Sequence, residues 1–263
     1  MLIRLADRII CADTLYPYIE DYCRDYAVNE QEAENEPDIS ITITPKDIEC
    51  ERERFAKEDM AAGNPVRQFS GEYLETLAVY RKIAERMPDH DTFLFHGSAV
   101  AVDGQAYIFT AKSGTGKSTH TGLWRQVFGD RAVMVNDDKP LIRIKKTGEK
   151  CGSENGFLAY VYGTPWDGKH RLSSPVSVPV KAVCILERGK ENRIVKIDKK
   201  TAMPEIIAQS YRPFEPASLH KTLSLIDSLT ESVGLFRMEC NMDPDAARMS
   251  YEVMSGAKER NKS

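Results

Sequence analysis

The residues whose types and spacing most clearly suggest chemistry are residues 111–119, which read Ala-Lys-Ser-Gly-Thr-Gly-Lys-Ser-Thr. Gly114 and Gly116 let the backbone turn tightly and leave N–H groups free to face phosphate oxygens. The pattern predicts that Lys117 reaches the β- and γ-phosphates of a nucleotide and that the Ser118 hydroxyl completes a Mg²⁺ shell. We therefore expect a phosphate-binding loop, with the binding residues Ser113, Gly114, Thr115, Gly116, Lys117, Ser118 and Thr119.

The segments on either side of this loop have the pattern that it requires. An apolar run at residues 106–109 predicts a strand, and residues 118–128 predict a helix whose N-terminus favours an anion. Ala111 stands where such loops usually begin with glycine, and alanine tolerates a positive φ poorly. The alternative is a glycine-rich turn that caps a helix and binds nothing. The lysine, the glycines, the paired hydroxyls and the flanking strand together favour phosphate binding.

Two adjacent carboxylates follow the next predicted strand. The short apolar run at residues 132–135 ends in Asn136, Asp137 and Asp138. Neighbouring carboxylates are unfavourable unless a cation lies between them or one of them is protonated. The alternative is a turn in which both acids face water. Beside a phosphate-binding loop, we interpret the pair as meeting a metal–phosphate complex.

A second polar loop follows the strand predicted at residues 157–162. It carries Trp166 and three consecutive cationic side chains, Lys169, His170 and Arg171. Such a group could clamp a transferring phosphate or bind an anionic acceptor. The alternative is an ordinary surface loop that Trp166 holds in place.

Composition narrows the class of protein. The chain has 263 residues, of which 41% are hydrophobic and 29% charged, and a net charge of −4 gives no reason to expect nucleic acid as a partner. Its six cysteines contain no C-x-x-C pair, which favours reduced thiols in a cytoplasm. No apolar run approaches the about 18 residues of a membrane helix, and the N-terminus lacks a signal-peptide pattern. The sequence predicts a cytoplasmic protein with neither membrane nor nucleic acid as partner.

The first 92 residues predict a small α+β region. Residues 39–44 alternate with period two and predict a half-buried strand, whereas residues 70–87 have the spacing of a helix with one apolar face. The charged segment 45–65 has little periodicity and predicts no element. Residues 29–38 contain five acids and no base, which is typical of a solvated loop.

Residues 93–263 change in character and predict a second domain. Asp103-Gly104 between two apolar runs indicates a hairpin, so the strand before the phosphate-binding loop is its second arm. In most proteins with such a loop that strand is reached by parallel crossovers. We further expect an edge strand at 141–146 before a turn at Thr147-Gly148, a hairpin of 180–186 with 193–197, and helices at 202–211, at 216–232 and from 244. The predicted fold class is α/β with a mixed, largely antiparallel sheet and a helical C-terminal tail.

The sequence from His96-Gly97 through the 113–118 loop to Asp137-Asp138 resembles the HPr kinase/phosphorylase family and its relative phosphoenolpyruvate carboxykinase. The resemblance covers roughly residues 93–197. It implies the fold of that family, ATP and Mg²⁺ as cofactors, and assembly into a homo-oligomer as one expectation. It implies that Asp137 accepts the proton of the acceptor hydroxyl, that Asp138 is linked to the metal, and that His96 lies near the transferring phosphate. A hydrogen-bonded core histidine is the alternative for His96.

These expectations combine into an ATP-dependent kinase that phosphorylates a hydroxyl group, on a serine of a protein or peptide or on a small molecule. Lys117 neutralises charge, Asp137 acts as the base, and Lys169 and Arg171 stabilise equatorial phosphate oxygens. One alternative is a non-catalytic ATP-binding module that regulates a partner. A carboxykinase-type phosphotransferase is weaker, because the arginine and lysine set that binds its carboxylate substrate is not evident.

Overall fold

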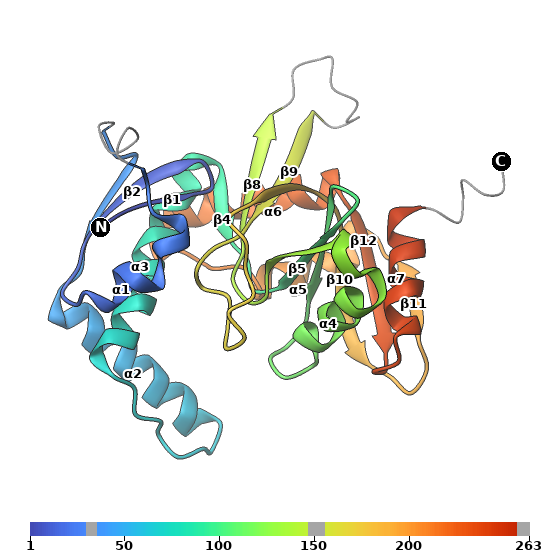
Figure 1. The fold of residues 1–263 in the computed structure, drawn as a ribbon, viewed down its shortest axis with the longest axis horizontal. Coiled ribbons are helices and arrows are strands. Elements are labelled where there is room, and N and C mark those ends of the chain that lie inside the picture. Colours follow the sequence, from blue (N-terminus) through green and yellow to red (C-terminus); the bar gives the residue numbers. More distant parts are fainter. Residues whose placement is uncertain (30–35, 147–155, 257–263) are drawn as a thin grey trace. The chain divides into compact units, whose positions relative to one another are not determined.

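A computed structural model describes residues 1–29, 36–146 and 156–256 (Figure 1). The chain divides into two compact units, Met1–Arg86 and Met87–Ser263. Most of the acidic segment 29–38 and the turn expected at Thr147-Gly148 lie outside the described residues.

The first unit contains a three-stranded sheet in the order β1-β2-β3, in which β2 and β3 run parallel. The strand expected at 39–44 is confirmed as β3, and the helix expected at 70–87 is confirmed as α3. The elements are β1 (Leu2–Leu5), β2 (Arg8–Asp13), α1 (Tyr18–Tyr22), η1 (Arg24–Tyr26), β3 (Ile39–Thr42), α2 (Pro45–Ala61) and α3 (Gly71–Arg86).

Helix α2 occupies the charged segment for which the sequence predicted no element. A capping box starts it, because the Asp47 carboxylate accepts a hydrogen bond from the Thr44 backbone N–H at 2.8 Å. Ion pairs join it to α3: Glu51, 3% exposed, pairs with Arg81, and Asp47 lies 2.7 Å from Lys82. The helix is therefore held by caps and charges, which leave no apolar stripe in the sequence.

The second unit is built on a nine-stranded sheet in the order β4-β8-β9-β10-β6-β5-β7, with β12 beside β10 and β11 beside β12. Parallel and antiparallel pairs both occur, so the α/β class with a mixed sheet is confirmed. The strands are β4 (Thr92–Leu94), β5 (Ser98–Val102), β6 (Gln105–Thr110), β7 (Ala132–Asn136), β8 (Leu141–Lys146), β9 (Phe157–Tyr162), β10 (Ser177–Arg188), β11 (Arg193–Lys196) and β12 (Gly234–Cys240). The helices are η3 (Met87–His90), α4 (Lys117–Phe128), η4 (Gly129–Arg131), α5 (Lys199–Ala208), α6 (Pro216–Ser232) and α7 (Asp245–Ser255).

The hairpin of β5 and β6 is confirmed. Asp103 and Gly104 both have positive φ, 53° and 74°, as the tight turn between antiparallel strands requires. Alternate residues of β6 then enter two cores: Ala106 and Ile108 pack on one face of the sheet, and Tyr107 and Phe109 on the other. The strand that leads into the 111–116 loop is therefore buried on both faces.

Helices cover both faces of this sheet. Helices α5 and α6 supply Ile206, Ile226 and Leu229 to one core, whereas α4 and α7 supply Trp124 and Met254 to the other. In Figure 1, α4 in green and α7 in red lie on the same side of the sheet. Because α4 packs against this face of the sheet and against α7, the position of its N-terminus is fixed.

Two strand predictions are wrong. Residues 180–186 and 193–197 do not form a hairpin, because β12 lies between β10 and β11: it pairs parallel with β10 and antiparallel with β11. Likewise β8 is not an edge strand, since it pairs with both β4 and β9. In each case the neighbour is distant in sequence or weakly patterned, and local periodicity carries no information about it.

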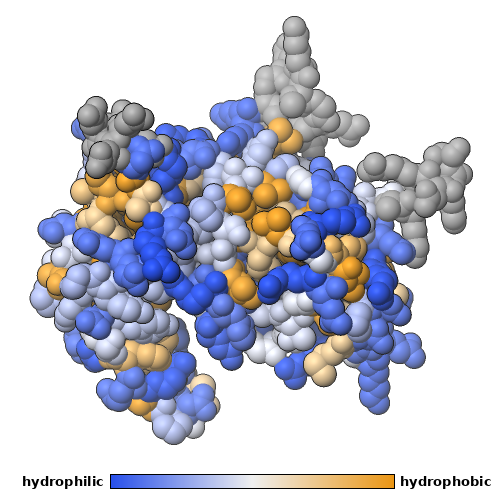
Figure 2. All heavy atoms as spheres, viewed as in Figure 1, coloured by the Kyte–Doolittle hydropathy of each residue, from blue (hydrophilic) through white to orange (hydrophobic). Residues whose placement is uncertain are grey.

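Hydrophilic residues cover much of the face drawn in Figure 2, and orange hydrophobic residues gather in small groups. Within the described residues, the helices all fall short of the length and apolar character needed to cross a bilayer.

Candidate functional site

Four strands of the second unit end at the same edge of the sheet. Strands β10 and β12 run parallel to β6, and β7 has the same direction because both it and β6 are antiparallel to β5. Ligands of α/β sheets bind beyond such carboxyl ends. The 111–116 loop, Asp137 and Arg188 therefore all emerge on one edge, although they are far apart in sequence.

The loop between β6 and α4 has the backbone that its glycines predicted. Gly114 has φ 77° and Gly116 φ 122°, values that other residues adopt only with strain. Ala111 is absent from the described residues with positive φ, so alanine in place of glycine is tolerated there. Gly116 precedes α4, whose first N–H groups and helix dipole point positive potential into the loop.

Lys117 lies at the centre of the edge. Its side chain is 8% exposed, and its Nζ donates a hydrogen bond to the Ala111 carbonyl at 3.1 Å. Burial lowers the pKa of this amine, while the nearby charges of Asp138 and Asp137 raise it. The structure thus brings together the lysine of the loop and the two carboxylates.

Asp137 is held by hydroxyl groups from two different elements. Ser98, at the start of β5, donates to Asp137 Oδ1 at 2.7 Å, and the Thr121 hydroxyl of α4 lies 2.9 Å from Ser98 Oγ. All three residues are buried. Within the described residues the other carboxylate oxygen, Oδ2, accepts no hydrogen bond, so it is available to a substrate proton.

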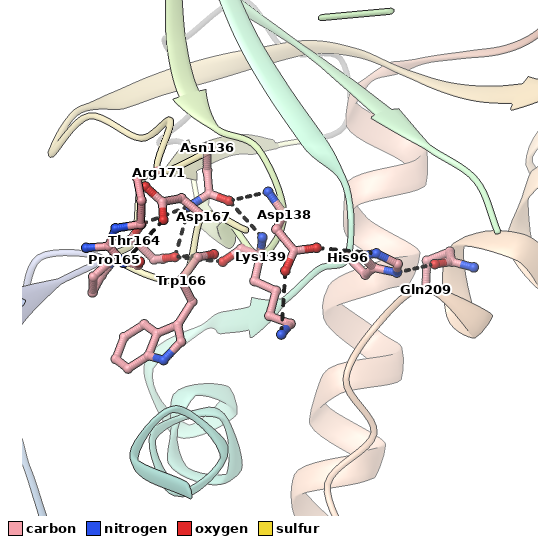
Figure 3. A network of polar contacts seen from close by, with 10 residues as sticks. All are labelled: His96, Asn136, Asp138, Lys139, Thr164, Pro165, Trp166, Asp167, Arg171 and Gln209. Carbon is pink, nitrogen blue, oxygen red and sulfur yellow. Dashed lines mark hydrogen bonds and ion pairs between the residues drawn. The ribbon is translucent and has the colours of Figure 1, made fainter. Parts of the chain in front are cut away.

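Asp138 faces His96 and Lys139 (Figure 3). His96 Nδ1 lies 2.7 Å from Gln209 Oε1, which only accepts, so Nδ1 carries the ring proton. Burial and then Lys117 lower the His96 pKa, against an opposing effect of Asp138. The lone pair of a neutral Nε2 then faces Asp138 Oδ1 at 3.5 Å. Two facing acceptors are stabilised by a cation between them.

These donors fit a hard divalent cation bound together with phosphate. The described residues contain no group of three or more His, Cys, Asp and Glu side chains able to enclose a metal. Mg²⁺ does not need one, because it takes one or two carboxylates, substrate phosphate oxygens and water. Asp138 would supply the carboxylate to such an ion, and Ser118, exposed at the start of α4, would supply the hydroxyl predicted from the loop pattern.

The second predicted loop lies against the carboxylates. Asn136 joins the two, since its amide nitrogen donates to the Thr164 carbonyl at 2.9 Å and its oxygen accepts from the Asp138 N–H at 2.9 Å (Figure 3). A Cβ on Gly163 would lie 1.9 Å from the Ser174 carbonyl oxygen, so only glycine allows the chain to enter here. A Cβ on Gly168 would lie 3.4 Å from Asp138 Cβ.

The predicted clamp residues divide between the interior and the surface of this loop. Trp166 is 2% exposed, whereas Lys169, His170 and Arg171 are exposed. Arg171 donates to the Pro165 carbonyl at 3.1 Å and lies 3.5 Å from Asp167, both within its own loop. Trp166 therefore anchors the loop, and the three cations stand at its outer rim.

Several functional neighbours were not predicted. Burial raises the pKa of Asp167, which accepts a hydrogen bond from Ser173 at 2.9 Å. A hydroxyl on a buried strand next to His96-Gly97 was a usable signal for Ser98. Nothing in local sequence indicated Gln209, which lies 113 residues from His96. The unpredicted positioning residues are Ser98, Thr121, Asn136, Asp167 and Gln209.

Comparisons with known proteins give a matching family and a distant similarity to solved structures. A family model described as SynChlorMet cassette protein ScmC matches residues 67–223. No curated protein matches the chain significantly. A solved structure, the Hpr(Ser) kinase/phosphatase from Coxiella burnetii, is similar with a TM-score of 0.32 and 10% identity over 64% of this chain and 98% of that chain.

Proposed function

The chain belongs to the family described as SynChlorMet cassette protein ScmC, and from that premise we propose that it is a Mg²⁺- and ATP-dependent kinase. It transfers the γ-phosphate to a hydroxyl group, on a serine of a protein or peptide or on a small molecule. Its second unit has the HPr kinase/carboxykinase type of nucleotide-binding fold. One observation carries the proposal: the buried ammonium of Lys117 lies beside Asp137 and Asp138 at the carboxyl edge of the sheet.

Phosphoryl transfer requires in-line positioning, neutralisation of charge and a base near the attacking hydroxyl. In our proposal, the N–H groups of the 111–116 loop and the N-terminus of α4 hold the donor phosphates, and Lys117 neutralises charge on the terminal one. Asp137 Oδ2 takes the proton as the acceptor oxygen forms its bond to the γ-phosphorus. The bond from that phosphorus to the β–γ bridging oxygen breaks, and ADP leaves.

Ser118 and Asp138 would hold Mg²⁺, which supplies neutralisation of the phosphate charge when bound. His96 faces the same carboxylate, and its orientation is fixed by Gln209 and by the bond from the His96 N–H to the Gln209 carbonyl at 2.8 Å. These contacts order the side chains of the edge before any ligand binds, which is how a kinase site gains rate.

The acceptor is proposed to enter between the carboxylates and the loop that follows β9. Gly168 lies next to Asp138, which brings the rim cations Lys169, His170 and Arg171 to this side of the site. An acceptor with negative charge near its hydroxyl group fits such a rim. Trp166 keeps the loop in place from inside.

The proposal is tested with γ-labelled ATP, Mg²⁺ and a cytoplasmic extract, separated afterwards into macromolecules and small molecules. We expect labelled acceptor with wild-type protein and about 10²-fold less with Asp137→Asn, the loss typical of a missing general base. ATP binding stays unchanged in that variant. Binding without transfer to any acceptor would favour the regulatory module, and equal transfer by both proteins would remove Asp137 from its role.

A further inference from the structure

A pocket of about 480 Å³ opens beside the phosphate-binding loop, on the side away from the carboxylates. One wall is the loop and the first turn of α4, including Gly114 and Thr119. The opposite wall is formed where two parallel strands end, by Arg188 at the end of β10 and by Asn241 and Met242 after β12. This volume lies within the usual range of pockets for small organic ligands.

The order of strands fixes the position of this pocket. Reading across the edge, β12 and β10 lie on one side of β6, and β5 and β7 lie on the other. Asp137 follows β7, so the carboxylates and the pocket flank the loop from opposite sides. A phosphate chain held by the loop therefore has one end at Asp137 and Asp138 and the other end at the pocket.

Arg188 connects the pocket to the loop. Its guanidinium donates hydrogen bonds to the backbone carbonyls of Gly114 and Thr115, the latter at 3.3 Å. These bonds hold the carbonyl groups away from the side that phosphate occupies. They also place a planar cation on the pocket wall, and guanidinium planes stack on aromatic rings.

Met242 gives the pocket an apolar surface with no role in the core. Its side chain is 78% exposed, the highest fraction among the exposed large hydrophobic residues of the described chain. The turn that carries Met242 is fixed by its neighbour Asn241, whose side chain donates to the Lys190 carbonyl and accepts from the Asp243 N–H. An exposed thioether on a fixed turn, opposite a guanidinium, is suited to contact a flat ring.

We propose that this pocket binds the nucleoside of the phosphoryl donor, with the base between Met242 and Arg188. The donor is then a nucleotide, and an inorganic polyphosphate is a poor substitute. This inference rests on the proposed function, because it assigns the other end of a ligand whose terminal phosphate lies at Lys117.

The test compares binding of Mg-ATP with binding of Mg-tripolyphosphate, which has the same phosphate chain and no nucleoside. We expect wild-type protein to bind Mg-ATP at least about 10-fold more tightly, in the range of a base stacked on protein side chains. Met242→Ser should weaken Mg-ATP binding about three- to tenfold and leave tripolyphosphate binding unchanged. Met60→Ser is the matched control, since Met60 is an exposed methionine of helix α2 in the other unit.

The outcomes separate the two proposals. Equal affinity for both ligands, or equal losses for both in Met242→Ser, would overturn the nucleoside pocket while leaving the phosphate-binding loop intact. Failure of both ligands to bind wild-type protein would overturn the proposed function and this inference with it. Thermal unfolding of each variant shows that the exposed substitutions leave the fold unchanged.

Discussion

Ser98 donates a hydrogen bond to Asp137 Oδ1 at 2.7 Å, across 39 residues of sequence. The bond orients one oxygen of the proposed base, and within the described residues it leaves the other, Oδ2, without a hydrogen bond. Hydrogen bonds to an ionised group contribute about 1.5–3 kcal/mol. We therefore expect Ser98→Ala to lower kcat about tenfold and to leave KM for ATP unchanged, measured by steady-state kinetics.

A double variant distinguishes a positioning role for Ser98 from a purely structural one. If Ser98 acts by orienting Asp137, adding Ser98→Ala to an Asp137→Asn background should have little further effect on kcat. Independent, multiplying losses would contradict the positioning role. Ser224→Ala is the matched control, because Ser224 is exposed on α6 and donates only to the His220 carbonyl within that helix.

Lys117→Ala should weaken Mg-ATP binding at least about tenfold and also lower turnover, because it removes the buried charge that faces the terminal phosphate. Lys112→Ala provides the control: Lys112 is an exposed lysine on the same loop. Calorimetric titration with Mg-ATP measures the affinity of both variants, and steady-state kinetics measures their turnover. Similar affinities for the two variants would show that the loop attracts phosphate only through general positive charge.

Two glycines, one just before α4 and one in the middle of it, should respond in opposite ways to alanine. Gly116 has φ 122°, so Gly116→Ala forces a strained backbone and should weaken Mg-ATP binding at least about tenfold. Gly122 is in the middle of the helix with open space around it, so Gly122→Ala should stabilise the protein by about 1 kcal/mol. ATP titration and thermal unfolding of both variants check this. Unchanged ATP affinity in Gly116→Ala would argue against a role for this backbone in binding.

His120 should make stability depend on pH. Burial lowers its pKa to about 4, whereas the unfolded chain has about 6.5, so below pH 6.5 the unfolded state binds a proton that the folded state refuses. The free energy of unfolding should fall by about 3 kcal/mol as the pH drops from 6.5 to 4. His120→Gln should flatten this part of the pH dependence in urea titrations. His220→Gln, at an exposed histidine, should leave it unchanged.

The elements that could be predicted are those whose own residues carry a signal, either a single apolar face or a specific turn sequence. The alternating strand β3, the one-sided helix α3 and the hairpin at Asp103 each carry their own signal. Helix α2 lacks such a signal because ion pairs to Arg81 and Lys82 hold it. Strand β12 was missed among predicted helices, since the residues that pair with it precede it by 40 to 52 positions in the sequence.

The candidate site divides in the same way. Lys117 and the two glycines of its loop were predicted because a phosphate-binding turn requires those residue types at fixed spacing. Gln209 was not, because its function follows from a contact that only the folded chain creates. Arg188 falls in the turn of the hairpin predicted for 180–186 and 193–197, whereas in the structure it is the last residue of β10, a central strand paired with β12. The residue types of the candidate site could be predicted from the sequence, and the contacts that hold them in place could not.

The position of β12 in the sheet also determines when, during synthesis, the carboxyl edge of the sheet with the proposed nucleotide site can be completed. Strand β11 finds its partner only in a segment that begins at Gly234, so the chain must hold β10 and β11 apart until that segment emerges. Pairings across long loops form slowly, and an unpaired central strand invites association with other chains. We therefore expect ribosome-stalled chains that end before Gly234 to need chaperones, and longer stalled chains to acquire ATP affinity only once residues 234–242 have left the exit tunnel.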